Sequence, residues 1–591
     1  MERFNFQVFK RFWAIAKAYW FGDEKWKARG GLLLIFILLL AYTGLSVVLN
    51  NQRGELISAL SAKSESRFWH TVVIFMSVIV AYAPVLAGYN YLRDRLGLAW
   101  RKWLTERFLD RYFGDRAYYQ INQFERDIDN PDQRIAEDVR SFTQESLTLA
   151  LVLGDSILEI IAFSGVLLGI SKPLVAFLLL YALVGTFATV GVFGQPLVRL
   201  NFEQLKKEAN FRFSLVRVRE NAEAIAFYQG EDQEAGQIKE RFMAAFNNYK
   251  RLLLWQLGLN GITNAYEFLP FVLPAIVVAP AVFGGEVEVG KVSEAQGAFL
   301  RVFFSLNVIV ARFQSLTAFG AGIDRLYSFA EALGHVEDEQ AHEILETAQS
   351  QKSDSQSAEK KGKERISGTP SAIQPTIQRD SDPELVLQHL TLQTPNYQRT
   401  LIEDLSLTVG HGSSLLVMGP SGCGKSSLMR AIAGLWDSGA GTIKRPPLGK
   451  ILFLPQKPYM VLGNLRDQLR YPYPKVDIED EMLLATLQQV NLPTLAERFG
   501  GLEAEEEWGD VLSLGEQQRL SFARILLHKP VYTILDEATS ALDDQNEKQL
   551  YKHLASCSGS YLSVGHRNSL TAYHQYLLRL EEDHAWQIVE L

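Results

Sequence analysis

Long apolar runs dominate the first half of the chain. Six of them lie near the ~20 residues that a helix needs to cross a lipid bilayer. These runs are Gly30–Asn50, His70–Tyr91, Ser146–Ile170, Pro173–Gly194, Thr263–Phe283 and Gln296–Thr317. A buried helix of a soluble protein could explain any one run, but it is a poor explanation of six together. The pattern therefore predicts an all-α, six-helix transmembrane domain over residues 30–335.

The basic residues predict the orientation of these helices. Lys and Arg gather before the first run and after the second, whereas the connection after the fifth run carries three glutamates and one lysine. Loops rich in Lys and Arg stay in the cytosol. We therefore expect the N-terminus and two long polar connections, Leu92–Glu145 and Gln195–Ile262, on the cytosolic side.

Residues 1–29 form a stretch that is long, charged and rich in aromatic residues, which together do not fit a signal peptide. This composition predicts an amphipathic helix at the membrane interface. The aromatic residues expected near the lipid headgroups are Phe4, Phe6, Phe9, Phe12, Trp13, Tyr19, Trp20 and Trp26.

A second domain follows a polar segment. Residues 336–384 are rich in Ser, Gln, Lys and Thr and contain few large apolar residues, so they cannot bury enough surface to fold and predict a flexible linker. Over residues 385–591, strand-like runs such as SLLVM and VYTILDE alternate with helical runs. This alternation predicts an α/β domain.

Composition narrows the classes of function. The chain has 591 residues, of which 47% are hydrophobic and 21% charged. Its net charge of -8 argues against nucleic acid as a partner, because phosphate binding normally requires a clustered positive face. The two cysteines, Cys423 and Cys557, have no metal-type spacing and indicate a reduced, disulfide-free domain.

The segment Gly419–Ser427, GPSGCGKSS, lies between a strand-like and a helical run. Glycines in such a P-loop let backbone N–H groups converge on phosphate oxygens, and the following helix adds its positive end. Lys425 is expected to reach the β- and γ-phosphates, and Ser426 to bind Mg²⁺. The predicted nucleotide-binding residues are Gly419, Pro420, Ser421, Gly422, Cys423, Gly424, Lys425, Ser426 and Ser427.

The run VYTILDE, residues 531–537, predicts a buried strand that ends in two carboxylates. A P-loop requires a magnesium partner, which makes a merely charged turn a weak alternative. Asp536 is expected to hold Mg²⁺ through water. Glu537 is expected to polarise the attacking water as a general base.

Further motifs resemble those of the ABC ATPases. Leu512–Leu520, LSLGEQQRL, resembles the signature sequence of that family, Gln456 in FLPQKPYM resembles its Q-loop glutamine, and His566 in SVGHR resembles its switch histidine. The residues that resemble the D-loop are Ser540, Ala541, Leu542 and Asp543.

The resemblance implies a half-transporter that works as a dimer. It places Gln456 and His566 beside Glu537 as catalytic residues, with Gln456 also a magnesium ligand and His566 on the γ-phosphate. It also implies that the signature acts on the ATP held by the other copy. The signature residues at issue are Ser513, Leu514, Gly515 and Glu516.

The chain departs from the family pattern at two positions. Leu514 stands where the signature usually has glycine, and Thr394 stands near the usual place of the adenine-stacking aromatic residue. Tyr397 could stack on adenine instead, and an ordinary loop tyrosine is the equal alternative. Neither departure removes a catalytic group, so hydrolysis is still expected.

Two segments of the membrane half resemble motifs of the D subfamily of ABC transporters: Asn130–Ile135, NPDQRI, and Glu223–Gly230, EAIAFYQG. That group includes long-chain acyl transporters and a vitamin B12 transporter, and related bacterial proteins take up vitamin B12 and peptides. The resemblance implies a coupling helix that docks on the ATPase; ordinary turn and helix residues are the alternative. The coupling candidates are Asn130, Asp132, Arg134 and Glu223.

Four charged residues fall within the apolar runs. Asp155 and Glu159 are four residues apart and share a helical face. Arg301 and Arg312 are eleven apart, about 20° from whole turns, which predicts a shared face as well. Such groups usually face the bundle interior or water. We expect both pairs to line or gate a hydrated cavity; structural pairing or snorkelling is the alternative.

Together these patterns predict a multi-pass, homodimeric transporter that uses ATP and Mg²⁺ and binds no nucleic acid. A hydrophilic solute, such as cobalamin or a peptide, is the expected substrate. The alternatives are a long-chain acyl substrate, or an ATP-gated channel or regulatory membrane protein. The expected location is a bacterial inner membrane, with the ATPase domain in the cytoplasm.

Overall fold

The computed structural model describes residues 6–124, 131–334, 376–395, 397–557, 559–582 and 584–591. The chain divides into two compact units, Met1–Lys360 and Lys361–Leu591. Most of the predicted linker, residues 336–384, lies outside the described residues. Its end does not follow the prediction, because Ile377 is only 3% exposed and Gln378–Ser381 form a strand. The ordered second unit thus begins before residue 385.

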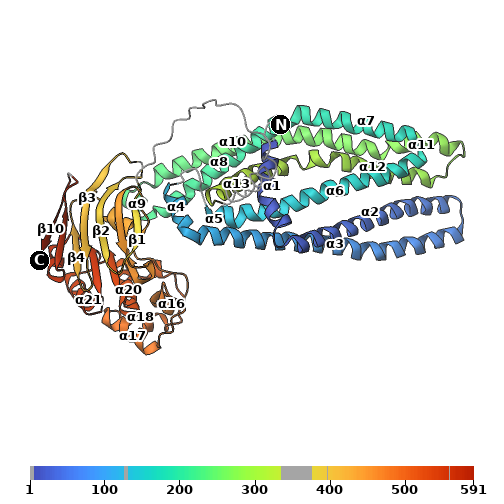
Figure 1. Cartoon of the computed structure of the whole chain (residues 1–591). Coiled ribbons are helices and arrows are strands. Elements are labelled where there is room, and N and C mark those ends of the chain that lie inside the picture. The colour runs from blue at the N-terminus through green and yellow to red at the C-terminus, as the bar shows by residue number, and fades with distance from the viewer. Residues whose placement is uncertain (1–5, 125–130, 335–375, 396, 558, 583) are drawn as a thin grey trace, which may run out of the picture. The chain divides into compact units, whose positions relative to one another are not determined.

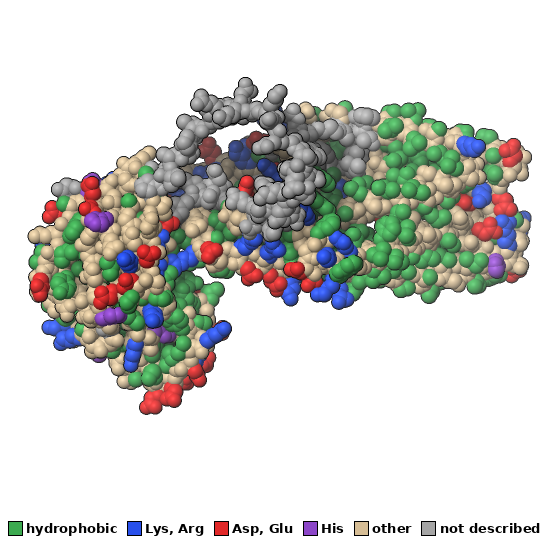
Figure 2. Space-filling view, in the orientation of Figure 1, with side chains coloured by type: hydrophobic (Ala, Val, Ile, Leu, Met, Phe, Trp, Pro, Cys, Tyr) green, Lys and Arg blue, Asp and Glu red, His purple; other side chains and the backbone are tan. Residues whose placement is uncertain are grey.

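The described part of the first unit is helical (Figure 1). Its helices are α1 (Phe6–Phe21), α2 (Lys25–Ser61), α3 (Glu65–Phe113), α4 (Ala117–Phe124), α5 (Pro131–Gln133), α6 (Val139–Ile170), α7 (Lys172–Thr189), α8 (Gln195–Glu220), α9 (Ala222–Tyr228), α10 (Glu231–Phe268), α11 (Leu273–Phe283), α12 (Gly290–Ala311) and α13 (Phe313–Ala332). Helices α2, α3, α6, α7, α11 and α12 run side by side, and hydrophobic side chains cover much of their visible surface (Figures 1 and 2).

Four helical segments in the described residues are long and apolar enough to cross a membrane: Lys25–Ser61, Glu65–Ile121, Pro131–Ile170 and Glu231–Phe283. They contain the first, second, third and fifth predicted runs. The fourth run covers α7 and a short π-helix, Val190–Gly194, and the apolar helix within it, Lys172–Gly185, is shorter than the other four. The sixth run lies on α12 and the start of α13. A helical membrane region is thus confirmed, and the count of six spans stays a prediction.

The N-terminal helix α1 has two faces. Phe9 and Trp13 are exposed, as expected for an interfacial helix, but Tyr19 is buried and stacks on Trp100 with ring centroids 5.5 Å apart. Arg11 of α1 also forms an ion pair with Asp324 of α13 at 2.6 Å. Part of the predicted headgroup-facing set therefore belongs to a protein core; Phe4 lies outside the described residues.

Helices α2 and α12 approach closely where two glycines meet. A Cβ added to Gly290 would collide with the carbonyl oxygen of Gly54 and with the hydroxyl of Ser58, which accepts a hydrogen bond from Gly290 N–H at 3.2 Å. Close approach through small residues is how helices associate in lipid, where the hydrophobic effect between them is weak. These glycines thus fix the spacing of α2 and α12.

The second unit contains two sheets in its described residues. The strands are β1 (Gln378–Ser381), β2 (Leu385–Gln393), β3 (Thr400–Val409), β4 (Ser414–Met418), β5 (Gly439–Arg445), β6 (Ile451–Leu454), β7 (Tyr532–Asp536), β8 (Ser560–Val564), β9 (Tyr576–Leu580) and β10 (Trp586–Glu590). One sheet has the order β1-β5-β2-β3, and the other has the order β10-β9-β4-β8-β7-β6. The predicted α/β domain is confirmed.

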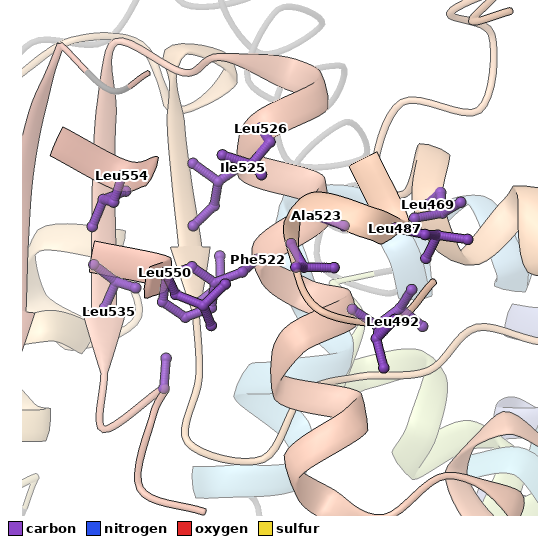
Figure 3. Close-up of a cluster of buried hydrophobic side chains, with 14 of the residues drawn as sticks. Leu469, Leu487, Leu492, Phe522, Ala523, Ile525, Leu526, Leu535, Leu550 and Leu554 are labelled. Atoms are coloured by element: carbon purple, nitrogen blue, oxygen red, sulfur yellow. The ribbon is translucent and has the colours of Figure 1, made fainter. Parts of the chain in front are cut away.

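Helices complete this unit. They are α15 (Lys425–Ala433), α16 (Leu465–Arg470), α17 (Asp480–Gln489), α18 (Leu495–Phe499), α19 (Trp508–Val511), α20 (Leu514–His528) and α21 (Asp544–Cys557). Figure 3 shows Phe522 and Ile525 of α20 in the same core as Leu535 of β7 and Leu550 of α21. The strands β4, β7 and β8 are buried on both faces, which explains their continuous apolar sequences.

We predict that Gly290→Ala lowers the thermal stability of the detergent-solubilised protein, because the new methyl group meets the backbone of α2. Overpacking of this kind costs about 1–3 kcal/mol. Gly44→Ala on α2 is the matched control, since nothing in the described residues lies within 4 Å of a Cβ there. Thermal unfolding measures both variants. An unchanged melting temperature for Gly290→Ala would contradict the proposed packing.

Candidate active site

In the described residues, the larger sheet has six strands. Four neighbouring strands of this sheet bring the candidate catalytic residues to one of its edges. The strands β4, β8, β7 and β6 are adjacent and parallel. Gly419 follows β4 directly and Glu537 follows β7 directly, while His566 and Gln456 come two residues after β8 and β6. Because the carboxyl ends of parallel strands meet at one edge, all four loops converge there.

The loop after β4 depends on glycine. Gly422 and Gly424 have φ of 82° and 105°, in the region that side chains rarely adopt. Gly424 immediately precedes α15, and a Cβ there would lie 3.1 Å from that of Leu401. Lys425 donates from Nζ to the carbonyl oxygens of Gly419 and Pro420, each at 2.8 Å. Its ammonium group thus lies within the loop that is predicted to cradle phosphates.

The remaining P-loop residues follow the same path. Pro420 and Ser421 form the exposed tip of the loop, and Ser427 lies on α15. Cys423 is buried in the core beneath the loop, among the residues that pack against β3 and β4. This position agrees with a packing role for the cysteine.

Ser426 and Asp536 could hold a magnesium ion. The Ser426 hydroxyl donates to Asp536 Oδ1 at 3.2 Å. Burial raises the pKa of the Asp536 carboxyl; the Ser426 hydrogen bond opposes this and the charge of Glu537 adds to it. No group of three or more His, Cys, Asp or Glu in the described residues could form a metal cage. Since Mg²⁺ is usually held by one or two protein oxygens together with phosphates, these residues fit it.

Glu537 is held from two sides. Gln456 Nε2 donates to its Oε2 at 2.8 Å, and His566 Nε2 lies 2.9 Å from its Oε1. The backbone of Glu537 has φ of 49°, an uncommon value for a residue with a side chain, which is frequent at functional sites. The structure therefore brings the three predicted catalytic residues together, with the carboxylate at their centre.

The signature segment begins helix α20. Ser513 caps the helix by accepting from Glu516 N–H at 3.3 Å, and Glu516 accepts from Ser513 N–H at 2.9 Å. Burial alone would raise the pKa of Glu516, but hydrogen bonds from Arg498 and Ser513 outweigh it and lower the pKa. Leu514 is exposed, so the departure from glycine leaves this cap intact.

The D-loop packs against the start of α20. A Cβ at Gly515 would lie 3.2 Å from the carbonyl oxygen of Ala541, so glycine permits this approach. Arg567, next to His566, donates to the carbonyl oxygen of Leu542 at 3.0 Å. Asp543 accepts from the backbone and side chain of Asn546, which orders the entry to α21.

Sequence reasoning missed Gln518, which links these motifs. Its side chain is 0% exposed; Nε2 donates to Gln456 O at 3.1 Å and to Ser540 Oγ at 3.2 Å, while Oε1 accepts from Ala541 N–H at 3.0 Å. One amide thus holds the Q-loop and D-loop on the signature helix. Gln518 lies four residues before Phe522 and seven before Ile525, which places it on the buried face of α20. This polar residue on an apolar helical face was the sequence feature that could have indicated its role.

Tyr397, the candidate for adenine stacking, lies in the loop between β2 and β3. It has φ of 57°, and its N–H donates to the carbonyl oxygen of Thr394 at 2.7 Å. Its role against adenine stays a prediction.

The coupling candidates lie in two places. Asn130 falls outside the described residues, Asp132 is exposed on α5, and Glu223 lies on α9. Arg134 is buried instead; Nη1 donates to Arg325 O at 2.5 Å and to Ser328 Oγ at 2.9 Å on α13. The guanidinium of Arg134 therefore forms hydrogen bonds within the first unit. It holds α13 in place and is not exposed for docking on the ATPase domain.

The intramembrane charges form one ion pair. Arg301 Nη1 donates to Glu159 Oε1 at 2.8 Å, and Ser305 donates to Glu159 Oε2 at 2.7 Å. Asp155 lies one turn away on α6. Arg312 occupies the junction between α12 and α13. The N–H of Arg312 still donates to the carbonyl oxygen of Val308 at 3.0 Å, as in a regular helix, so the shared face of Arg301 and Arg312 stays a prediction.

Comparisons with known proteins cover both units. Residues 15–283 match a family described as "ABC transporter transmembrane region 2", and residues 402–540 match "ABC transporter". The chain is 44% identical to an uncharacterized ABC transporter ATP-binding protein of Synechocystis, over 96% of this chain and 82% of that protein.

Two named relatives are also similar over nearly the whole chain. ABC transporter D family member 2, chloroplastic, of Arabidopsis thaliana is 39% identical over 97% of this chain and 86% of its own. The lysosomal cobalamin transporter ABCD4 of Homo sapiens is 31% identical over 100% of this chain and 97% of its own.

We predict that Gln518→Leu lowers kcat for ATP hydrolysis about tenfold, the equivalent of ~1.4 kcal/mol. The change leaves buried groups of the Q-loop and D-loop unpaired, whereas the P-loop is untouched, so the KM for ATP should stay within about twofold. Gln545→Leu, at an exposed site on α21, is the matched control. Steady-state kinetics on the folded fraction measure both; a purely structural role would lower stability and leave kcat per folded molecule unchanged.

Proposed function

The chain belongs to the ABC transporter family as a half-transporter of the D type, and we propose that two copies form a homodimer that moves a hydrophilic solute. It binds ATP and couples ATP hydrolysis to transport across a membrane as a multi-pass membrane protein. The pairing of two copies, the residues that hold the nucleotide and the magnesium ion, and the class of solute are what we propose. The observation that carries the proposal is the edge of the six-stranded sheet at which Glu537 lies between Gln456 and His566.

The second copy completes the site. Ser513 and Leu514 are exposed at the start of α20, a helix of 15 residues. Such a helix start offers free N–H groups and a partial positive charge to a phosphate. We propose that these residues, with Gly515 and Glu516, reach the nucleotide bound by the partner's P-loop, and that the D-loop residues Ser540–Asp543 lie at this interface.

Within each site we propose the following roles. Lys425 contacts the β- and γ-phosphates, His566 the γ-phosphate, and Glu537 orients and deprotonates the attacking water. Ser426, Asp536 and Gln456 hold Mg²⁺, which neutralises phosphate charge when bound. The Ser426–Asp536 contact at 3.2 Å supports this assignment.

We assign six spans to residues 30–335, with residues 1–29 at the membrane interface and residues 336–384 containing the linker. The N-terminus, both long connections and the ATPase domain lie in the cytoplasm, beneath a bacterial inner membrane. The basic residues before the first span and after the second support this orientation.

The polar groups within the membrane unit favour a hydrophilic solute such as cobalamin or a peptide. Glu159 and Arg301 pair inside apolar runs, where charges are costly unless they serve a hydrated path. A relative that is similar along the whole chain is named a lysosomal cobalamin transporter. A long-chain acyl substrate would meet these charges with an apolar tail.

We predict ATP-dependent, vanadate-sensitive accumulation of cobalamin or a peptide by proteoliposomes, against a concentration gradient. Glu537→Gln should abolish accumulation and lower ATP hydrolysis at least about 100-fold, because it removes the general base. Glu481→Gln, an exposed carboxylate on α17, is the control. Flux that only follows the gradient would identify an ATP-gated channel, and accumulation of acyl substrates alone would overturn the hydrophilic assignment.

A further inference from the structure

The polar cluster around Glu159 contains one acid more than it has bases. Arg301 and Ser305 satisfy both oxygens of Glu159, which is 8% exposed. Asp155, one helical turn away, has a buried Oδ1 without a hydrogen-bond partner among the described residues. Asp155 interacts electrostatically with both Glu159 and Arg301. With all three groups ionised, the cluster carries one net negative charge.

Helices α2 and α3 contribute aromatic rings to this cluster. Their apolar runs, residues 30–50 and 70–91, contain no Lys or Arg. Arg93 of α3, just beyond the apolar run, acts on Tyr89, and it forms an ion pair with Asp94 at 3.0 Å, so the two together add no net charge. The ring of Tyr42 lies 5.3 Å from that of Tyr82 and 6.4 Å from that of Tyr89, measured between centroids. Tyr42 interacts with Arg301, and the charge of Asp155 acts on Tyr89. Tyr42 therefore borders Arg301 and Tyr89 borders Asp155, and the ring contacts of Tyr42 join the three tyrosines into one group.

The packing of the helices brings these side chains together. Helix α6, which carries Asp155 and Glu159, contacts α2, α3 and α12. All of the residues in the cluster fall inside the apolar runs, and each of the three tyrosines is half-buried. An unneutralised carboxylate at this depth is costly, and its cost falls when a positive group approaches.

A carboxylate close to a group of tyrosine rings is suited to an organic cation. The carboxylate accepts hydrogen bonds from an ammonium group, and the rings attract a cation held within about 6 Å of a ring centroid. An inorganic cation would require further oxygen ligands. The ion pair of Glu159 and Arg301 has no net charge, so it forms one side of the site. The carboxylate of Asp155 is left to bind the cation.

We propose that Asp155, Tyr42, Tyr82 and Tyr89 form a binding site for a cationic group of the transported solute, such as the ammonium group of a basic peptide. This inference rests on the proposed transport of a hydrophilic solute and narrows its class. It favours a peptide that carries a positive charge over a neutral solute.

The test uses the full-length protein in nanodiscs and two capped tripeptides, Ala-Lys-Ala and the same peptide with an acetylated lysine. They differ in one positive charge. Binding is measured by titration, and ATP hydrolysis is measured with and without each peptide. We expect the cationic peptide to bind at least about tenfold more tightly than the acetylated one and to stimulate hydrolysis.

Asp155→Asn should remove this preference, so that the two peptides bind within about twofold of each other. Tyr89→Leu should weaken binding of the cationic peptide while Tyr89→Phe, which keeps a ring, retains it; this pair applies if Asp155→Asn does not fold. Asp110→Asn, an exposed carboxylate on α3, is the control and should behave as wild type.

Equal binding of both peptides by the wild type would overturn the inference. The inference would also be overturned if Asp155→Asn changed only the pH dependence of ATP hydrolysis, because a proton rather than a cationic solute would then neutralise the carboxylate of Asp155. These outcomes are separate from failure of the proposed function, since accumulation of cobalamin or a neutral peptide by proteoliposomes would still establish transport of a hydrophilic solute.

Discussion

The parallel pairing of β4, β8, β7 and β6 is the constraint on which the catalytic geometry depends. Gln456, Glu537 and His566 each stand within two residues of a strand end, so the strand register fixes their positions more firmly than a long loop could. The carboxylate of Glu537 can lie within hydrogen-bond reach of both Gln456 and His566 because their strands flank its own. The buried Gln518 then ties this edge to the signature helix and the D-loop.

The membrane unit uses polar groups sparingly and in pairs. Glycines set the spacing of α2 and α12, and Arg134 secures α13 together with the ion pair of Asp138 and Arg325 at 2.5 Å. Within the apolar runs, the pair of Glu159 and Arg301 is neutral, while Asp155 lacks a hydrogen-bond partner at Oδ1 in the described residues. The unbalanced charge of Asp155 distinguishes a group of side chains that can bind a cation from a group that only packs.

The sequence predicted most of the candidate active site, because short motifs place their residues directly after buried strands. It could not reveal the hydrogen bonds of Gln518, which join segments far apart in the chain, or the inward direction of Arg134. The sequence also did not predict that Arg312 stands between two helices, α12 and α13. The ordered strand at Gln378–Ser381 was missed because its polar residues resemble the linker and its pairing with β5 is tertiary.

The central claim is that the signature of one copy completes the nucleotide site of the other, and mixed dimers with separately tagged subunits test it most directly. Pairing a Ser513→Arg copy with a Lys425→Ala copy leaves one intact site if the signature acts across the dimer. ATP hydrolysis should then return, whereas a wild-type copy paired with a copy carrying both substitutions should stay inactive. The reverse pattern, with activity only in the second pairing, would contradict the account.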